Sequence, residues 1–245
     1  MNTLSLVIPS YDAGPLLGRI LGHVPVLRTV ALANGFELIE VVIVDDGGPK
    51  PAEASISDVP AGVDVRILRN ERNRGKGFSV RRGALAAKGG WVLMSDVDES
   101  APLSQFAVLA PYAGMAIACG SRCRGQDARP FHRRLLSRVF NALSGTGLLD
   151  AQCGFKLFNM SLMRPIFETL RTERFAFDVE LILKAPSVVE VPVEWHGGRR
   201  SSLKVWRDAP RMLLDLLRIR CMVPSRMGRI ESSGLDGNRK KGCRC

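Results

Sequence analysis

The chain has 245 residues, enough to bury one large core, and its apolar fraction of 46% is ordinary for a globular protein. Its 35 Lys and Arg residues outnumber 24 Asp and Glu residues, which gives a formal net charge of +11. This excess favours a polyanionic partner: nucleic acid, an anionic lipid surface or a phosphorylated substrate. The six cysteines form no CxxC pair, which argues against a zinc site and favours reduced cysteines.

The beginning of the chain runs directly into an apolar segment typical of a strand. It lacks a basic region followed by an apolar signal core, so we expect no signal peptide. A membrane span needs about 20 consecutive apolar residues. The apolar runs here are shorter, so we also expect no transmembrane helix.

Predicted strands alternate with predicted helices in the first half of the chain. Four apolar or β-branched runs are typical of buried strands: 4–8, 38–44, 64–68 and 91–94. Helical patterns lie between them, at 15–33 and 75–87. This alternation predicts an α/β fold with a mostly parallel sheet and helices on both faces. Ligands of such sheets bind beyond the carboxyl ends of the strands.

Two amphipathic helices are predicted in the second half. One covers 131–143, and the other begins near Asp208, which suits an N-cap, with Pro210 in its first turn. Packing of the apolar face against the domain is the commoner outcome for such helices. The net charge nevertheless favours contact of at least one of them with a membrane surface, with its arginines near the headgroups.

Two acidic pairs directly follow predicted strands. Asp96 and Asp98 are two residues apart, so in an extended segment both carboxylates point the same way and can bind one hard cation. Water and a diphosphate would complete its coordination. Asp45 and Asp46 also need partners, because a carboxylate at a strand end is otherwise costly. Hydrogen bonding to a nucleoside is the functional interpretation, and a solvated turn is the alternative for one of them.

A basic, glycine-flanked segment at 70–77 leads into a predicted helix. Its backbone N–H groups and Lys76 could hold a phosphate at the helix N-terminus. A capped surface turn is the alternative. No GxxxxGK[ST] motif occurs and no GxGxxG follows a strand, which argues against P-loop NTPases and dinucleotide oxidoreductases.

Taken in order, these motifs resemble family 2 glycosyltransferases. The second half resembles the dolichyl-phosphate glucosyltransferase branch, and the resemblance covers about residues 3–222. The motifs that carry it are Pro9-Ser-Tyr11, Val44-Asp-Asp-Gly47, Asn73-Arg-Gly-Lys-Gly77, Ser95-Asp-Val-Asp98, Asp150-Ala-Gln-Cys-Gly-Phe-Lys156, Arg174-Phe-Ala-Phe-Asp-Val-Glu-Leu181 and Glu190-Val-Pro-Val-Glu-Trp195.

The resemblance implies a GT-A fold, a nucleotide-diphosphate sugar donor (UDP-glucose first), Mg2+ or Mn2+, and a polyprenyl-phosphate acceptor. It implies a GT-A catalytic domain over 1–207, an amphipathic helix over 208–225 and a flexible basic tail over 226–245. Asp96 and Asp98 are expected to hold the metal, and Asp98 and Asp150 are the catalytic candidates. The nucleotide-sugar would be bound by Pro9, Tyr11, Asp45, Asp46, Lys76 and Asp96.

The acceptor decides whether a catalytic base is needed. A sugar hydroxyl needs one, whereas a phosphate monoester is already an anion near neutral pH and mainly needs cations that position it. The second half has surplus cations, which suits a phosphate acceptor and inversion by direct attack. For Asp178, the N-cap of the following helix is favoured over catalysis. The candidate acceptor residues are Arg122, Arg133, Arg134, Arg200 and Lys204.

Other functions remain open. A family 2 enzyme could transfer its sugar to a glycan or small-molecule hydroxyl, and a degenerate member could bind nucleotide-sugars without catalysis. A nucleic-acid-binding protein is disfavoured, because stacking aromatics are few, with two Tyr and three Trp. We expect a cytoplasmic protein on the inner face of the cytoplasmic membrane, in contact with an anionic membrane surface.

Overall fold

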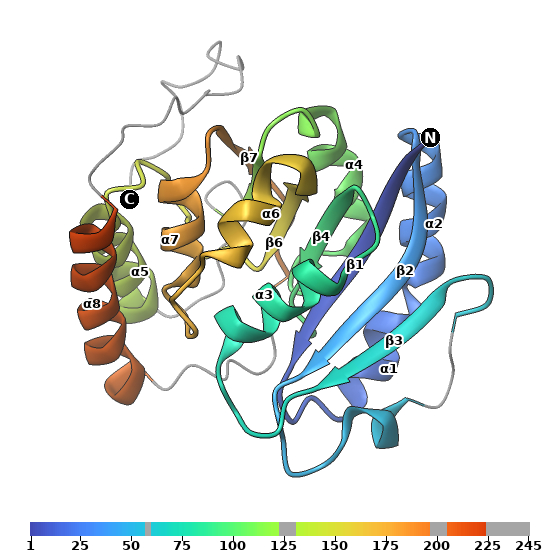
Figure 1. The fold of residues 1–245 in the computed structure, drawn as a ribbon, viewed down its shortest axis with the longest axis horizontal. Coiled ribbons are helices and arrows are strands. Elements are labelled where there is room, and N and C mark those ends of the chain that lie inside the picture. Colours follow the sequence, from blue (N-terminus) through green and yellow to red (C-terminus); the bar gives the residue numbers. More distant parts are fainter. Residues whose placement is uncertain (57–59, 123–130, 197–204, 224–245) are drawn as a thin grey trace.

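The computed structural model describes residues 1–56, 60–122, 131–196 and 205–223 (Figure 1). A single sheet holds seven strands in the order β3-β2-β1-β4-β6-β5-β7. β6 is antiparallel to both of its neighbours, and the other neighbouring pairs are parallel. The strands are β1 (Asn2–Ser10), β2 (Phe36–Asp45), β3 (Asp64–Arg69), β4 (Trp91–Ser95), β5 (Ile117–Ser121), β6 (Phe155–Asn159) and β7 (Val188–Pro192).

Helices cover both faces of this sheet, which confirms the predicted α/β architecture. Figure 1 shows α1 and α2 on one face and α3, α6 and α7 on the other, with α5 and α8 side by side at one end of the molecule. The α-helices are α1 (Pro15–Gly22), α2 (Val24–Ala33), α3 (Lys76–Ala86), α4 (Phe106–Leu109), α5 (Phe131–Ser144), α6 (Met160–Glu168), α7 (Phe177–Lys184) and α8 (Val205–Met222). Short 3-10 turns lie at Ala52–Ser55, Leu103–Gln105 and Ala110–Tyr112.

Alternate residues of β1 point into two different cores. Leu6 and Ile8 pack with α1, α2 and α4, whereas Val7 packs with α3, α6 and α7. This is the two-residue period of a strand that is buried on both faces. A third, smaller cluster joins α5, α7 and α8 through Phe140, Ala176, Val179, Met212, Leu216 and Ile219.

The helix predicted at 15–33 is interrupted at His23, between α1 and α2. Pro25 lies in the first turn of α2, and in a continuous helix it would lack the N–H that bonds to the Leu21 carbonyl and its ring would clash with that carbonyl. By length and composition alone, Pro15–Ala33 could cross a membrane, so our expectation of no transmembrane helix remains a prediction. Its buried residues Leu17, Ile20, Leu21, Val24, Leu27 and Ala31 pack against the sheet in the core.

The last helix begins earlier than predicted. α8 starts at Val205, three residues before Asp208, so the assignment of Asp208 as N-cap and Pro210 to the first turn is wrong. Proline is tolerated near a helix start, so it marked the right region without fixing the first residue. α8 also packs on α5 and α7, so it is part of the folded core rather than an appendage.

Candidate functional site

The predicted donor residues lie at one edge of the sheet. β1, β2 and β4 end there, and β6, which runs in the opposite direction, begins there. Asp45 ends β2 and Asp46 follows it, Lys76 begins α3, and Asp96 and Asp98 follow β4. The structure therefore brings the acidic pairs and the basic loop to the edge where parallel sheets bind ligands.

Asp46 holds the basic loop in place. Its buried carboxylate accepts hydrogen bonds from the Asn70 side chain at 2.8 Å and from the backbone N–H groups of Arg74 at 2.9 Å and Gly75 at 2.8 Å. A carboxylate that accepts several N–H groups can be buried at little net penalty. Asp46 thus shapes the segment that presents Lys76.

Asp45 is satisfied within the chain as well. It forms an ion pair with Arg69 and accepts hydrogen bonds from the backbone N–H groups of Ala52 at 3.0 Å and Gly48 at 3.3 Å. The prediction that these strand-end carboxylates need partners is correct: the side-chain partners, Arg69 and Asn70, come from the end of β3, and the other partners are backbone N–H groups of the two loops. The hydrophobic periodicity of the sequence does not indicate which residues pair with Asp45 and Asp46. Contacts of Asp45 and Asp46 with a nucleoside remain a prediction.

Pro9 lies on the neighbouring strand β1, and Tyr11 lies just beyond its end. Pro9 is buried within β1 and pairs in register with Val44. Tyr11 follows the strand and is 48% exposed, so its ring is accessible at the same edge. The backbone joins the two strands there, because the N–H of Asp46 donates to the Ser10 carbonyl at 2.8 Å.

Lys76 and Asp96 form an ion pair at the centre of this edge. The Lys76 Nζ lies 2.6 Å from Asp96 Oδ1, and both side chains are partly buried. The N–H of Asp96 donates to the Gly154 carbonyl at 3.0 Å, which ties the segment after β4 to the start of β6. The basic loop at 70–77 and the acidic motif at 96–98 thus meet directly, through two residues that are 20 positions apart in the sequence, 76 and 96.

Asp98 is in an environment that disfavours its negative charge. Burial raises the pKa of its carboxyl group and the nearby charge of Asp96 raises it further, against smaller opposing effects of Ser100 and Lys76. The Ser100 N–H donates to Asp98 at 3.1 Å. A divalent cation would relieve this repulsion, and carboxylate oxygens suit Mg2+ or Mn2+. The residues present therefore fit such an ion.

The protein would supply only part of the coordination. Among the described residues, no group of three or more His, Cys, Asp or Glu side chains could hold a metal on its own. One of the two carboxylates is already paired with Lys76. A cation bound here would depend on outside oxygens, as expected for an ion that also contacts a diphosphate.

A buried lysine beside this edge was missed by the sequence interpretation. Lys156, on β6, is 1% exposed, and its Nζ lies 2.7 Å from Asp178 Oδ1. Burial alone would lower the pKa of Lys156, but the carboxylate of Asp178 together with the neighbouring Cys119 and Cys153 outweighs this effect and raises that pKa. Asp178 lies in the first turn of α7, whose N-cap is Ala176, so its assignment as N-cap is wrong. The buried ammonium needs a counterion, and this draws Asp178 inward.

Arg122 and Asp150 pair with each other. Arg122 Nε donates to Asp150 Oδ2 at 2.5 Å, a second guanidinium N–H contacts the other oxygen, and the Arg122 backbone N–H donates at 3.1 Å. The guanidinium also lies 5.0 Å from the ring centroid of Trp195. Asp150 is 2% exposed and Arg122 9%, so this geometry gives Asp150 a clear role in holding Arg122. A catalytic role of Asp150 remains a prediction.

The other candidate acceptor residues are not placed. Arg200 and Lys204 lie outside the described residues. Arg133 and Arg134 belong to α5, but their side chains lie outside the described part of the structure. Binding of the acceptor phosphate by these four residues remains a prediction.

Comparisons with known proteins agree with the sequence motifs. Residues 5–169 match the family model described as glycosyl transferase family 2. A dolichyl-phosphate beta-glucosyltransferase of Dictyostelium discoideum is 32% identical over 241 residues, covering 89% of this chain and 73% of that protein. The corresponding protein of Mus musculus is 34% identical over 254 residues, covering 89% and 74%.

Solved structures share the fold. Glucosyl-3-phosphoglycerate synthase of Mycobacterium tuberculosis, in complex with Mn2+, UDP-glucose and phosphoglyceric acid, superposes with a TM-score of 0.64 at 18% identity, covering 91% of this chain and 81% of that one. Mannosyl-3-phosphoglycerate synthase of Rubrobacter xylanophilus gives a TM-score of 0.61 at 20% identity, covering 96% and 78%. These likenesses confirm the predicted GT-A fold.

Proposed function

Because the chain belongs to glycosyl transferase family 2, we propose that it transfers glucose from UDP-glucose to a polyprenyl phosphate. The observation that carries this proposal is that Lys76, Asp96 and Asp98 lie close together at one edge of the sheet, next to a loop that Asp46 holds in place. The relatives in Dictyostelium discoideum and Mus musculus are dolichyl-phosphate beta-glucosyltransferases, which supports glucose as the sugar and a lipid phosphate as the acceptor. The solved synthase that holds UDP-glucose and Mn2+ supports the donor.

The donor half acts through positioned charge. Lys76, at the start of α3, would face the diphosphate. The Phe78 N–H in the same turn would not, because it donates to the Glu173 carbonyl at 2.9 Å. Asp96 and Asp98 would hold Mg2+ or Mn2+, which when bound neutralises charge on the departing nucleoside diphosphate. Tyr11, exposed beside the strand ends, would contact the nucleoside together with Asp45.

The acceptor half needs cations rather than a base. A phosphate monoester is ionised near neutral pH, so its oxygen can attack the anomeric carbon without a proton acceptor in the enzyme. Arg122 is held by Asp150 and the Trp195 ring, and among the candidate acceptor residues whose side chains the structure describes, it would orient this phosphate. Attack opposite the leaving diphosphate inverts the anomeric centre.

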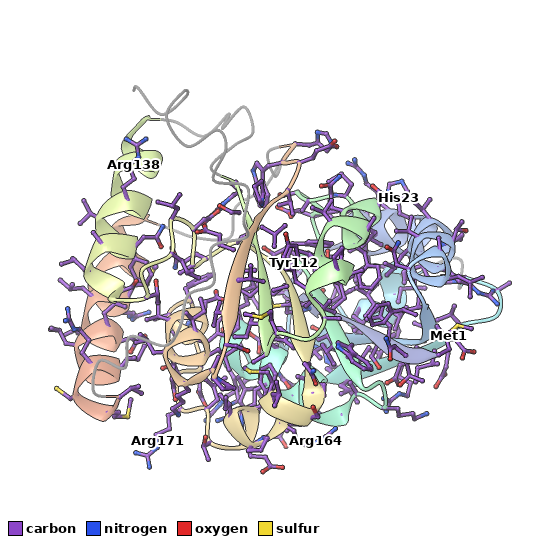
Figure 2. The ribbon with its side chains drawn as sticks, turned by 90° about the horizontal axis from the view of Figure 1, so that it is seen from above. Met1, His23, Tyr112, Arg138, Arg164 and Arg171 are labelled. Carbon is purple, nitrogen blue, oxygen red and sulfur yellow. The ribbon has the colours of Figure 1, made fainter. Side chains whose placement is uncertain are left out.

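The outer face of α5 and α8 supports contact with an anionic membrane. Figure 1 shows both helices at the end of the molecule away from α2, and Figure 2 shows Arg138 projecting from α5. Arginines with exposed side chains accompany the apolar residues on both helices, as in helices that lie on a lipid surface. The exposed apolar side chains are Val139, Leu143, Leu213, Leu214 and Leu217.

Membrane contact can be tested with matched variants. Leu217→Asp should abolish flotation of the protein with vesicles that contain anionic lipid, without lowering the Tm. Leu32→Asp on α2 is the control, since Leu32 is 57% exposed and Leu217 56%. Equal flotation of both variants would refute a membrane role for this face. Peripheral placement on the cytoplasmic side of a membrane is proposed on the same grounds.

The activity is tested by mass analysis of products. The protein is supplied with a panel of UDP-sugars, Mg2+ or Mn2+, and either a short polyprenyl phosphate or simple glycosides. We expect a glucosyl polyprenyl phosphate, lost in Asp98→Ala. Product only from the glycosides would favour a hydroxyl acceptor instead. Donor binding without any product would indicate a binding protein, and salt-sensitive RNA binding alone would indicate a nucleic-acid partner.

A further inference from the structure

Gly154 lies directly opposite Asp96 where β4 and β6 meet. Ser95 pairs with Phe155 in the antiparallel ladder, and the next pair outward joins Asp96 to Gly154 by an N–H···O=C hydrogen bond of 3.0 Å. Opposed residues in an antiparallel ladder project their side chains on the same face of the sheet. The Asp96 side chain therefore shares its face with the position where Gly154 has none.

The carboxylate of Asp96 occupies the space that a side chain at 154 would need. A Cβ atom built on Gly154 would lie 1.9 Å from Asp96 Oδ2, 2.3 Å from Cγ and 2.8 Å from Oδ1. Gly154 is not among the glycines with positive φ, so its backbone is one that other residues can adopt. The need for glycine here is steric and not conformational.

Lys76 bounds the same carboxylate on another side. Its Nζ is 2.6 Å from Asp96 Oδ1, and Lys76 follows the backbone N–H groups of Arg74 and Gly75 that Asp46 fixes. Asp96 is thus confined between a charged partner and the bare Cα of Gly154. Any side chain at 154 would force the carboxylate to rotate away and would break the ion pair.

We infer that Gly154 is a positioning residue of the donor site, since the absence of its side chain determines where the Asp96 carboxylate lies. The inference deepens the proposed function and rests on it for the role of Asp96 toward the donor. It also gives a physical reason for the glycine in the Asp150–Lys156 motif. The residue acts through Asp96 and does not itself contact the substrate.

A double-mutant cycle tests this inference. The four proteins are the wild type, Gly154→Ala, Asp96→Ala and the double variant. Gly154→Ala should weaken Mn2+ binding in the presence of UDP about ten-fold, or by about 1.4 kcal/mol. The EPR signal of free Mn2+ measures this binding. Gly154→Ala should also lower the Tm. In the Asp96→Ala background the three atoms nearest to the added Cβ, all of the carboxylate, are gone, so the same change should neither weaken Mn2+ binding further nor lower the Tm. The effect of Gly→Ala on the unfolded chain is common to both backgrounds and cancels.

Gly90→Ala is the matched control. Gly90 precedes β4 at its other end, and a Cβ there would make only an ordinary contact with Thr3 at 3.6 Å. It should neither weaken Mn2+ binding nor lower the Tm. Equal losses from Gly154→Ala with and without the Asp96 carboxylate would overturn the inference, and so would no loss in either. The Tm cycle needs no donor, so it still decides the inference if the protein proves not to transfer sugar.

Discussion

Replacing Asp46 by Asn tests whether this carboxylate is what holds the phosphate-facing loop. Asp46 accepts hydrogen bonds from Asn70, Arg74 and Gly75 through both of its oxygens. Asn has one acceptor oxygen, so its NH2 group must face at least one N–H that the carboxylate now satisfies. The best remaining arrangement leaves the buried Gly75 N–H without an acceptor.

The expected loss of stability follows from these contacts. A hydrogen bond to a charged group contributes about 1.5–3 kcal/mol, and an unsatisfied buried donor adds to its loss, so Asp46→Asn should reduce the free energy of unfolding by about 2–4 kcal/mol. For a chain of this length that corresponds to a fall in Tm of roughly 5–10 °C. The KM for the nucleotide-sugar should rise as well, because the loop presents Lys76.

Urea denaturation and amide hydrogen exchange measure these effects. The backbone amides of Arg74 and Gly75 should lose protection in Asp46→Asn. The control is Asp12→Asn at the same edge, which removes one negative charge from an exposed residue with positive φ, a conformation that Asn tolerates. If Asp46→Asn lost no more stability than Asp12→Asn and kept both amides protected, the assignment of Asp46 would be refuted.

Three further predictions concern buried charges. Burial and the neighbouring carboxylate raise the pKa of Asp98, so Asp98→Asn should raise the Tm of the metal-free protein at neutral pH while abolishing transfer. This gain in Tm should vanish below pH 3.8, where the carboxyl group is protonated in both the folded and the unfolded protein. Burial raises the pKa of Glu40, but accepted hydrogen bonds outweigh it and lower that pKa, so Glu40→Gln should reduce the free energy of unfolding by about 2–4 kcal/mol at neutral pH. The stability that Glu40 contributes is present above its unfolded pKa of 4.5 and is lost as the pH falls through its folded pKa. Urea titrations measure this loss, and the control Glu37→Gln, at an exposed residue, should not show it. Lys156→Met should cost about 3–5 kcal/mol by stranding the Asp178 carboxylate, and adding Asp178→Leu should restore part of that loss in calorimetry, whereas a further loss would contradict the pairing.

The first half of the fold could be predicted because its strands are long apolar runs that end in polar pairs. The runs at 38–44 and 91–94 gave strands with buried residues on both faces, and the position of Asp98 at the sheet edge followed from that. β6 was not predicted, since five residues with Lys156 at the second position do not read as a buried strand. The counterion on α7, together with the Cys153 carbonyl that also accepts from Lys156, makes that strand consistent with a core.

Partners between distant segments were beyond the sequence pattern. Periodicity places a residue on an element, but it does not say which charge from another element lies opposite. Asp178 illustrates the problem, because its place at the start of α7 suits a helix cap equally well. The pairs Asp45–Arg69 and Arg122–Asp150 are contacts of the same kind.

The reversed direction of β6 has a consequence for how this chain can change. β5 ends at Ser121 and β6 begins at Phe155, and since these two strands are antiparallel neighbours, the connection between them leaves and returns at the same edge of the sheet. That excursion includes α5 and lies wholly after the donor motifs in the chain. The free energy of closing such a loop grows only slowly with its length. Insertions and replacements at exposed positions of this excursion can therefore alter what meets the donor site without disturbing the strands that build it, provided that Arg122, Asp150 and Gly154 at its two ends are kept.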